Sequence, residues 1–117
     1  STHDCDTLSG WWQNFPDEAK SFAAFKGWPY EKTLSSEHLF EILRDAHHTP
    51  SYFHINLLQE YLALFPELVH SDPKDERINT PGPQTPQNWT YRFKPFLEEI
   101  VNHEKLTDTI KTILLGN

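Results

Sequence analysis

One short segment, residues 51–57, has the alternation of a β-strand in a chain whose other patterns are helical. Phe53, Ile55 and Leu57 would point to one side of the strand, and the residues between them to the other, as a period of two requires. A single strand cannot satisfy its own backbone N–H and C=O groups, so it needs a neighbouring strand. We therefore expect this segment to pair with protein outside these 117 residues or with a second copy of the chain.

Five other segments are predicted to form helices. Their apolar residues recur at intervals of three and four, and proline, serine or glycine residues mark several of their ends. The predicted helices span about residues 14–26, 35–47, 59–64, 95–100 and 104–115.

Residues 66–95 are expected to form a long irregular loop, because they hold six of the nine prolines. A loop of this length in a compact domain usually has a function of its own. The fold class predicted from these patterns is mainly α with one strand, in a single segment, 1–117, without a second domain.

The charge of the chain argues against one class of partner. Lys and Arg number 10, Asp and Glu number 17, and the net charge is −7, so the chain repels the phosphate backbone of nucleic acids. No basic cluster marks contact with a membrane surface, and no apolar run approaches the roughly 20 residues that span a bilayer. Cys5 is the single cysteine, which rules out an internal disulfide and favours a cytoplasmic location. The absence of methionine, an initiator included, suggests an excised or trimmed piece.

The first residues bring together chemically active side chains: His3, Asp4, Cys5 and Asp6. A metal site would draw its ligands from more than one segment. No second cluster has ligand spacing, so we predict no metal ion. Taken alone, Asp4 and Asp6 are most simply explained as turn or helix-capping residues.

The adjacent pair Trp11-Trp12 permits two interpretations. Indole rings can stack on the flat faces of sugars, but paired tryptophans are more often part of a core. The local pattern favours the core and leaves both interpretations open.

Four motifs follow one another in a specific order. They are residues 2–12 (THDCDTLSGWW), 55–62 (INLLQEYL), 76–82 (ERINTPG) and 88–92 (NWTYR). Together they resemble the motifs of glycoside hydrolase family 77, the amylomaltases, which are 4-α-glucanotransferases. Cys5 departs from the family, which more often has Asn or Thr at this place, and this departure leaves the subfamily open.

The resemblance implies that the chain is the C-terminal part of a (β/α)8 barrel, with residues 55–62 as its last strand and the segment that continues it, and with the active site at the strand ends. Asp4 would be the acid that stabilises the transition state, and His3 would hydrogen-bond the same sugar. Asn79 would lie near the substrate groove. Gln59 also matches a family position, without an assigned role. Neither a metal ion nor an organic cofactor is implied.

The implied reaction moves segments of α-1,4-linked glucan between chains. Retaining transfer needs a nucleophilic carboxylate and a separate general acid/base about 5–5.5 Å apart. In the family both precede the His-Asp motif, so we expect the isolated chain to be inactive. Its expected partners are maltooligosaccharides, the N-terminal remainder of the same enzyme and, for an isolated piece, further copies of itself through strand exchange.

Two other functions stay open on the sequence alone. A hydrolase of the amylase superfamily would share the His-Asp pair and would use water as the acceptor. A non-catalytic helical module that binds sugars or another protein is the third hypothesis.

Overall fold

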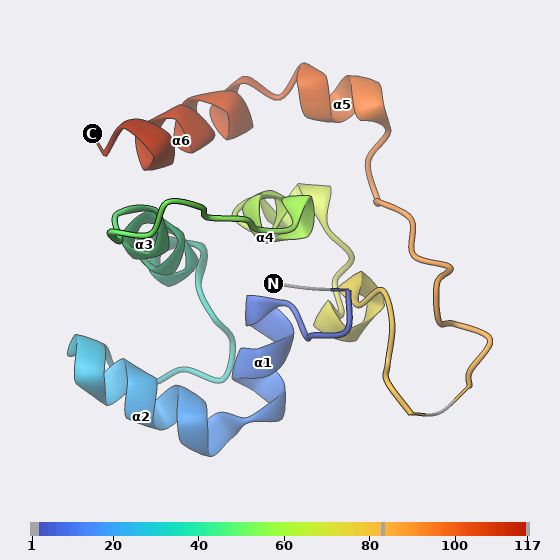
Figure 1. Ribbon diagram of the computed structural model, residues 1–117, viewed down its shortest axis with the longest axis horizontal. Helices are drawn as coiled ribbons and strands as arrows, with labels where there is room; N and C mark the ends of the chain where they lie inside the picture. Colours follow the sequence, from blue (N-terminus) through green and yellow to red (C-terminus); the bar gives the residue numbers. More distant parts are fainter. Residues whose placement is uncertain (1–2, 83, 117) are drawn as a thin grey trace.

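The computed structural model describes residues 3–82 and 84–116, which form short helices joined by irregular segments (Figure 1). Helices α1 and α2 pack together, and α6 packs against α3, α4 and α5. None of the helices in the described residues is long and apolar enough to cross a membrane. In chain order the helical elements are α1 (Leu8–Asn14), α2 (Pro16–Lys26), α3 (Ser36–His47), α4 (Leu58–Leu62), the 3₁₀ turns η1 (Pro66–Leu68) and η2 (Pro73–Glu76), α5 (Leu97–Val101) and α6 (Glu104–Leu115).

The five predicted helices are all present, each with its ends within two residues of the predicted ones. Local signals account for their limits. The Ser35 side chain accepts a hydrogen bond from the His38 amide and begins α3. Gly27, with φ 75°, ends α2 in the left-handed conformation that glycine adopts without strain.

Helix α1 was not predicted, although its sequence carries a signal. Leu8, Trp11 and Trp12 have helical spacing, and Thr7 caps the helix by accepting a hydrogen bond from the Gly10 amide at 3.2 Å. Gly10 weakens the pattern because glycine is a poor helix former. This helix decides where the chemically active residues before Thr7 lie.

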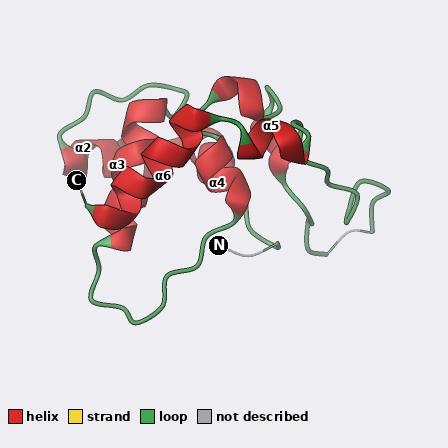
Figure 2. Cartoon of the chain, turned by 90° about the horizontal axis from the view of Figure 1, so that it is seen from above, coloured by secondary structure: helices red, strands yellow, loops and turns green. Residues whose placement is uncertain are grey.

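The predicted strand at residues 51–57 is wrong. The described residues contain no β-strand, as Figure 2 also shows, and this segment has an irregular path between α3 and α4. Phe53 is 86% exposed and Ile55 is 77% exposed. The physical reason is that a strand needs a neighbouring strand to bond its backbone N–H and C=O groups. The described part of the chain offers no such strand to this segment.

The main core lies between α1, α2, α3 and α6. Its buried members are Trp12, Ala19, Ala23, Leu34, Leu39, Leu43, Leu64 and Ile113. The open question about the tryptophan pair is therefore answered for Trp12, which is 1% exposed and donates its indole N–H to the Glu31 carbonyl at 2.7 Å. Trp11 is partly buried against the same core, and its indole N–H donates to the Glu18 carboxylate at 2.7 Å.

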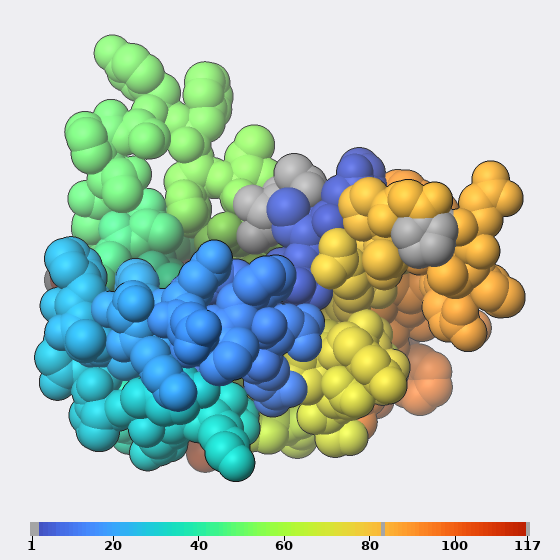
Figure 3. All heavy atoms as spheres, turned by 90° about the horizontal axis from the view of Figure 1, so that it is seen from below, coloured from blue at the N-terminus to red at the C-terminus, as the bar shows by residue number. Residues whose placement is uncertain are grey.

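An apolar surface remains uncovered beyond this core. The segment between α3 and α4 projects from the body of the molecule, in green in Figure 3. Its Tyr52, Phe53 and Ile55 side chains are all more than three-quarters exposed. Exposed apolar groups of this kind favour contact with another apolar surface.

We expect the isolated chain to self-associate through this segment, because association removes apolar surface from water. The double variant Phe53→Ser/Ile55→Ser should lower the average mass measured by light scattering. Phe25→Ser, at an 83% exposed position on α2, is the matched control and should change the mass less. A wild-type chain that stays monomeric at high concentration contradicts this expectation.

Candidate functional site

The N-terminal segment is anchored at the point where α1 begins. Both carboxylate oxygens of Glu60, on α4, lie 3.2 Å from the Leu8 amide nitrogen. The Glu60 side chain is 1% exposed. Burial raises the pKa of Glu60 from 4.5 to about 7, and the hydrogen bond from Leu8 opposes this rise. The anchor fixes the residues before Thr7 on the surface of the helical body.

Arg77 joins this N-terminal segment to the long loop. Its Nη1 donates to Asp6 Oδ1 at 2.6 Å, its Nη2 to the Asp4 carbonyl at 2.7 Å and its Nε to the Asn79 carbonyl at 2.9 Å. The side chains of Arg77 and Asp6 are only 22% and 17% exposed. The guanidinium therefore uses charge-assisted hydrogen bonds to hold together two segments about seventy residues apart in sequence.

His3, Asp4 and Asn79, the three residues that the sequence singled out, meet at this junction. Asn79 Nδ2 donates to Asp4 Oδ1 at 2.7 Å, across 75 positions of sequence. The Asn79 amide also donates to the His3 carbonyl at 3.1 Å, and His3 Nε2 lies 3.4 Å from Asp4 Oδ1. The side chains of His3 and Asp4 are 50% and 48% exposed. The cluster is thus rigidly linked on one side and open on the other.

A second turn of the loop packs onto the same cluster. The Trp89 amide donates to the Ile78 carbonyl at 2.9 Å, and the Trp89 ring lies 4.7 Å from the His3 ring, centroid to centroid. Asn88 and Thr80 exchange two hydrogen bonds, at 3.0 and 3.2 Å. The motif at residues 88–92 therefore contacts both the motif at residues 76–82 and the motif at residues 2–12.

Trp89 has an unusual backbone conformation. Its φ is 65°, and among the described residues it is the one residue other than glycine with a positive φ. It occupies the third position of a turn closed by the hydrogen bond from the Thr90 amide to the Gln87 carbonyl, a position where glycine or asparagine is usual. For a bulky residue such a conformation costs roughly 1–3 kcal/mol and occurs most often at functional sites.

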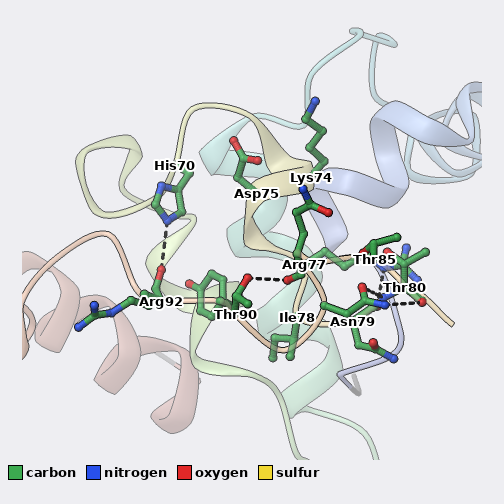
Figure 4. A pocket seen from close by; sticks show the side chains of 13 residues that line it. His70, Lys74, Asp75, Arg77, Ile78, Asn79, Thr80, Thr85, Thr90 and Arg92 are labelled. Carbon is green, nitrogen blue, oxygen red and sulfur yellow. Dashed lines mark hydrogen bonds between the residues drawn. The ribbon is translucent and has the colours of Figure 1, made fainter. Parts of the chain in front are cut away.

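A cavity of about 600 Å³ opens beside the cluster, between two stretches of the loop (Figure 4). Its lining includes Arg77, Asn79, Tyr91 and Arg92. His70 closes one end, with Nε2 3.1 Å from the Arg92 carbonyl. The loop predicted to be irregular is therefore folded around its own cavity.

Two buried polar side chains, one on α4 and one in the loop itself, share a second cavity. Gln59 and Glu76 line this cavity of about 320 Å³, and within the described residues neither Gln59 Nε2 nor Glu76 Oε2 has a hydrogen-bond partner. Burial raises the pKa of Glu76. Tyr91 donates to Glu76 Oε1 at 3.3 Å, and burial together with this carboxylate raises the pKa of Tyr91. Glu76 and Tyr91 thus connect the start of the loop to its end.

Metal ligands do not come together in the part of the chain that the structure describes. It holds no group of three or more His, Cys, Asp or Glu side chains that could bind an ion. Cys5 is exposed. The cluster's chemistry is that of a carboxylate, an amide and an imidazole, which together suit hydrogen bonding to hydroxyl groups.

The motifs pointed to His3, Asp4 and Asn79 but not to Arg77, the residue that joins them. Asp6, interpreted as a capping or turn residue, instead pairs with Arg77, and the cap of α1 is Thr7. The signal for Arg77 was its place two residues before Asn79 in a motif. Trp89 likewise carried only a motif signal, because no sequence pattern predicts a positive φ for tryptophan.

Comparisons with known proteins agree with this arrangement of motifs. The family model described as 4-alpha-glucanotransferase matches residues 1–98. A 4-alpha-glucanotransferase of Chlamydia pneumoniae is 50% identical over 116 residues, which are 99% of this chain and 22% of the relative. One from Chlamydia trachomatis serovar D is 48% identical over 113 residues, 97% of this chain and 21% of the relative. No solved structure matches the chain.

The family model and these relatives thus assign the chain to a known enzyme family. The chain belongs to the 4-alpha-glucanotransferase family, glycoside hydrolase family 77. It spans about a fifth of the length of the relatives that it matches, 22% for the first of them.

Arg77→Lys tests the junction. Lysine keeps the charge but cannot donate in three fixed directions, so we expect the free energy of unfolding in urea to fall by about 1–2 kcal/mol. Arg92→Lys, at an exposed position in the same loop, should change it by less than about 0.5 kcal/mol. Equal effects of the two substitutions would show that the Arg77 contacts contribute no stability.

Glu60→Gln tests the buried carboxylate. The pKa of Glu60 is about 7 in the folded chain and 4.5 in the reference state, so its contribution to stability is complete below pH 4.5 and is lost as pH rises to about 7. The loss amounts to about 3 kcal/mol. Glutamine keeps an acceptor for the Leu8 amide without titrating, so Glu60→Gln should flatten this part of the stability profile. Glu98→Gln, on exposed α5, should leave the profile unchanged.

Proposed function

We propose that this chain forms part of the glucan-binding site of a 4-α-glucanotransferase, which transfers α-1,4-glucan segments with retention of configuration. Family membership supports the reaction class. The observation that carries the site is the hydrogen bond from Asn79 to Asp4, because it unites residues from two motifs beside His3. Since the chain spans about a fifth of its relatives, the activity is proposed for the whole protein.

In this proposal the Asp4 carboxylate stabilises positive charge that develops on the sugar ring in the transition state. A fixed negative group is effective there because it needs no reorganisation during the reaction. Asn79 and the neighbouring residues fix the direction of Asp4 Oδ1. The half-exposed His3 ring then hydrogen-bonds a hydroxyl group of the same sugar.

The remaining chemistry comes from the part of the relatives' length that this chain does not cover. A retaining mechanism needs a nucleophile and a general acid/base, two carboxyl groups about 5–5.5 Å apart. We propose that both lie there, in a (β/α)8 barrel that this chain completes, so that the isolated chain is inactive. The exposed apolar segment before α4 supports such a missing partner.

The acceptor in the proposed reaction is a sugar hydroxyl of a second maltooligosaccharide. A sugar hydroxyl can displace an enzyme carboxylate without a metal ion or an organic cofactor, so the proposal includes neither. The cytoplasm is the proposed location, in keeping with the single cysteine.

Asp4→Asn in the full-length protein is the direct test. Removing the negative charge should lower kcat/KM for disproportionation of maltotriose by at least about 10²–10³-fold. Asp108→Asn, on the exposed side of α6, is the matched control and should have near-normal activity.

Near-normal disproportionation by the Asp4→Asn enzyme would refute the assignment. The products separate the enzyme classes: a transferase makes glucans longer than its substrate, whereas a hydrolase releases only shorter sugars.

A further inference from the structure

We propose that Trp89 is a sugar-stacking residue of this site, holding the glucose unit next to the one that Asp4 contacts. The inference rests on the proposed function and deepens it, since it assigns a substrate contact to a residue outside the His3, Asp4 and Asn79 cluster. It depends on the position, the exposure and the backbone conformation of Trp89.

The position of Trp89 follows from two contacts. Its ring lies 4.7 Å from the His3 ring, with the two planes inclined by 45°. Its backbone is bonded to Ile78, the residue before Asn79, and Asn79 and Trp89 line the same surface hollow of about 400 Å³. The indole therefore lies beside His3, whose Nε2 is 3.4 Å from Asp4 Oδ1.

The exposure of Trp89 distinguishes it from the other tryptophans. Trp89 is 63% exposed, whereas Trp12 is buried and Trp11 and Trp28 pack against the main core. Its contact with His3 therefore leaves most of the indole available. An indole presents a large flat apolar surface that matches the C–H face of a pyranose ring, and it loses little side-chain freedom on contact.

The backbone conformation of Trp89 costs conformational free energy. Glycine or asparagine would adopt a φ of 65° with little strain, but the residue there is tryptophan. Strain that the surrounding structure maintains is characteristic of functional positions. The strain therefore indicates that the indole side chain is needed at this position. The backbone hydrogen bond from Trp89 to Ile78 holds the turn in place.

Three other exposed aromatic residues lack this combination. Phe25 lies on α2 and packs on Phe22, and Tyr52 and Phe53 lie on the uncovered segment before α4. None of them lines a cavity with Asn79. They serve as controls for the removal of an exposed aromatic ring.

The test compares Trp89→Asn, Trp89→Phe and the control Phe25→Asn in the full-length protein. Asparagine tolerates the left-handed backbone, so Trp89→Asn removes the ring without adding strain. A contact made equally in the ground and transition states changes KM and leaves kcat unchanged. Trp89→Asn should therefore raise KM for maltoheptaose roughly three- to tenfold, with less effect on kcat. Trp89→Phe should lie between Trp89→Asn and the wild type, and Phe25→Asn should match the wild type.

Four outcomes decide the proposal. A higher KM for maltoheptaose, with weaker maltoheptaose binding in a calorimetric titration, supports it. An unchanged KM in an enzyme that Asp4→Asn inactivates overturns the Trp89 assignment alone. A fall in kcat that is equal for maltotriose and maltoheptaose also overturns it, because Trp89 would then act only by positioning His3. Full activity of Asp4→Asn overturns the proposed function instead, and the titration still measures whether Trp89 contacts the sugar.

Discussion

The Arg77 guanidinium is the contact on which the arrangement of the site depends. One side chain donates to Asp6, to the Asp4 carbonyl and to the Asn79 carbonyl, so it fixes an N-terminal segment against a loop that follows much later. Three donors in one rigid plane determine both the distance and the orientation of the two segments. The hydrogen bond from Asn79 to Asp4 requires this alignment, and the packing of Trp89 on His3 follows from it.

The helical body supports this junction and leaves part of its apolar surface uncovered. Its core around Trp12 and Leu43 is closed, while the segment before α4 leaves Phe53 and Ile55 in water. Gln59 Nε2 and Glu76 Oε2 are buried without a hydrogen-bond partner among the described residues, and His70 Nε2 lies 3.8 Å from Glu76 Oε2. Uncovered apolar groups and unpaired buried polar atoms both raise the free energy of a chain. They are consistent with a chain that spans about a fifth of its relatives.

Local signals predicted some elements correctly and others wrongly for clear reasons. The cap at Ser35 and the stop at Gly27 act over three or four residues, so the helix limits were readable. The alternation at residues 51–57 has equally clear local form, yet a strand also needs a partner, and the described chain supplies none. Helix α1 was missed because Gly10 obscures its apolar spacing. Propensity is decided locally, whereas strand pairing is decided by the rest of the protein.

The sequence by itself determined five of the helices, the acidic charge, and the motif residues His3, Asp4 and Asn79. Only the tertiary structure decided that these residues touch, that Arg77 joins them, and that Trp89 lies beside them in a left-handed conformation. The physical reason is the sequence distance over which each kind of interaction acts. Helix signals act between residues three or four apart, whereas the Asp4–Asn79 contact spans 75 positions and exists only after the chain has closed.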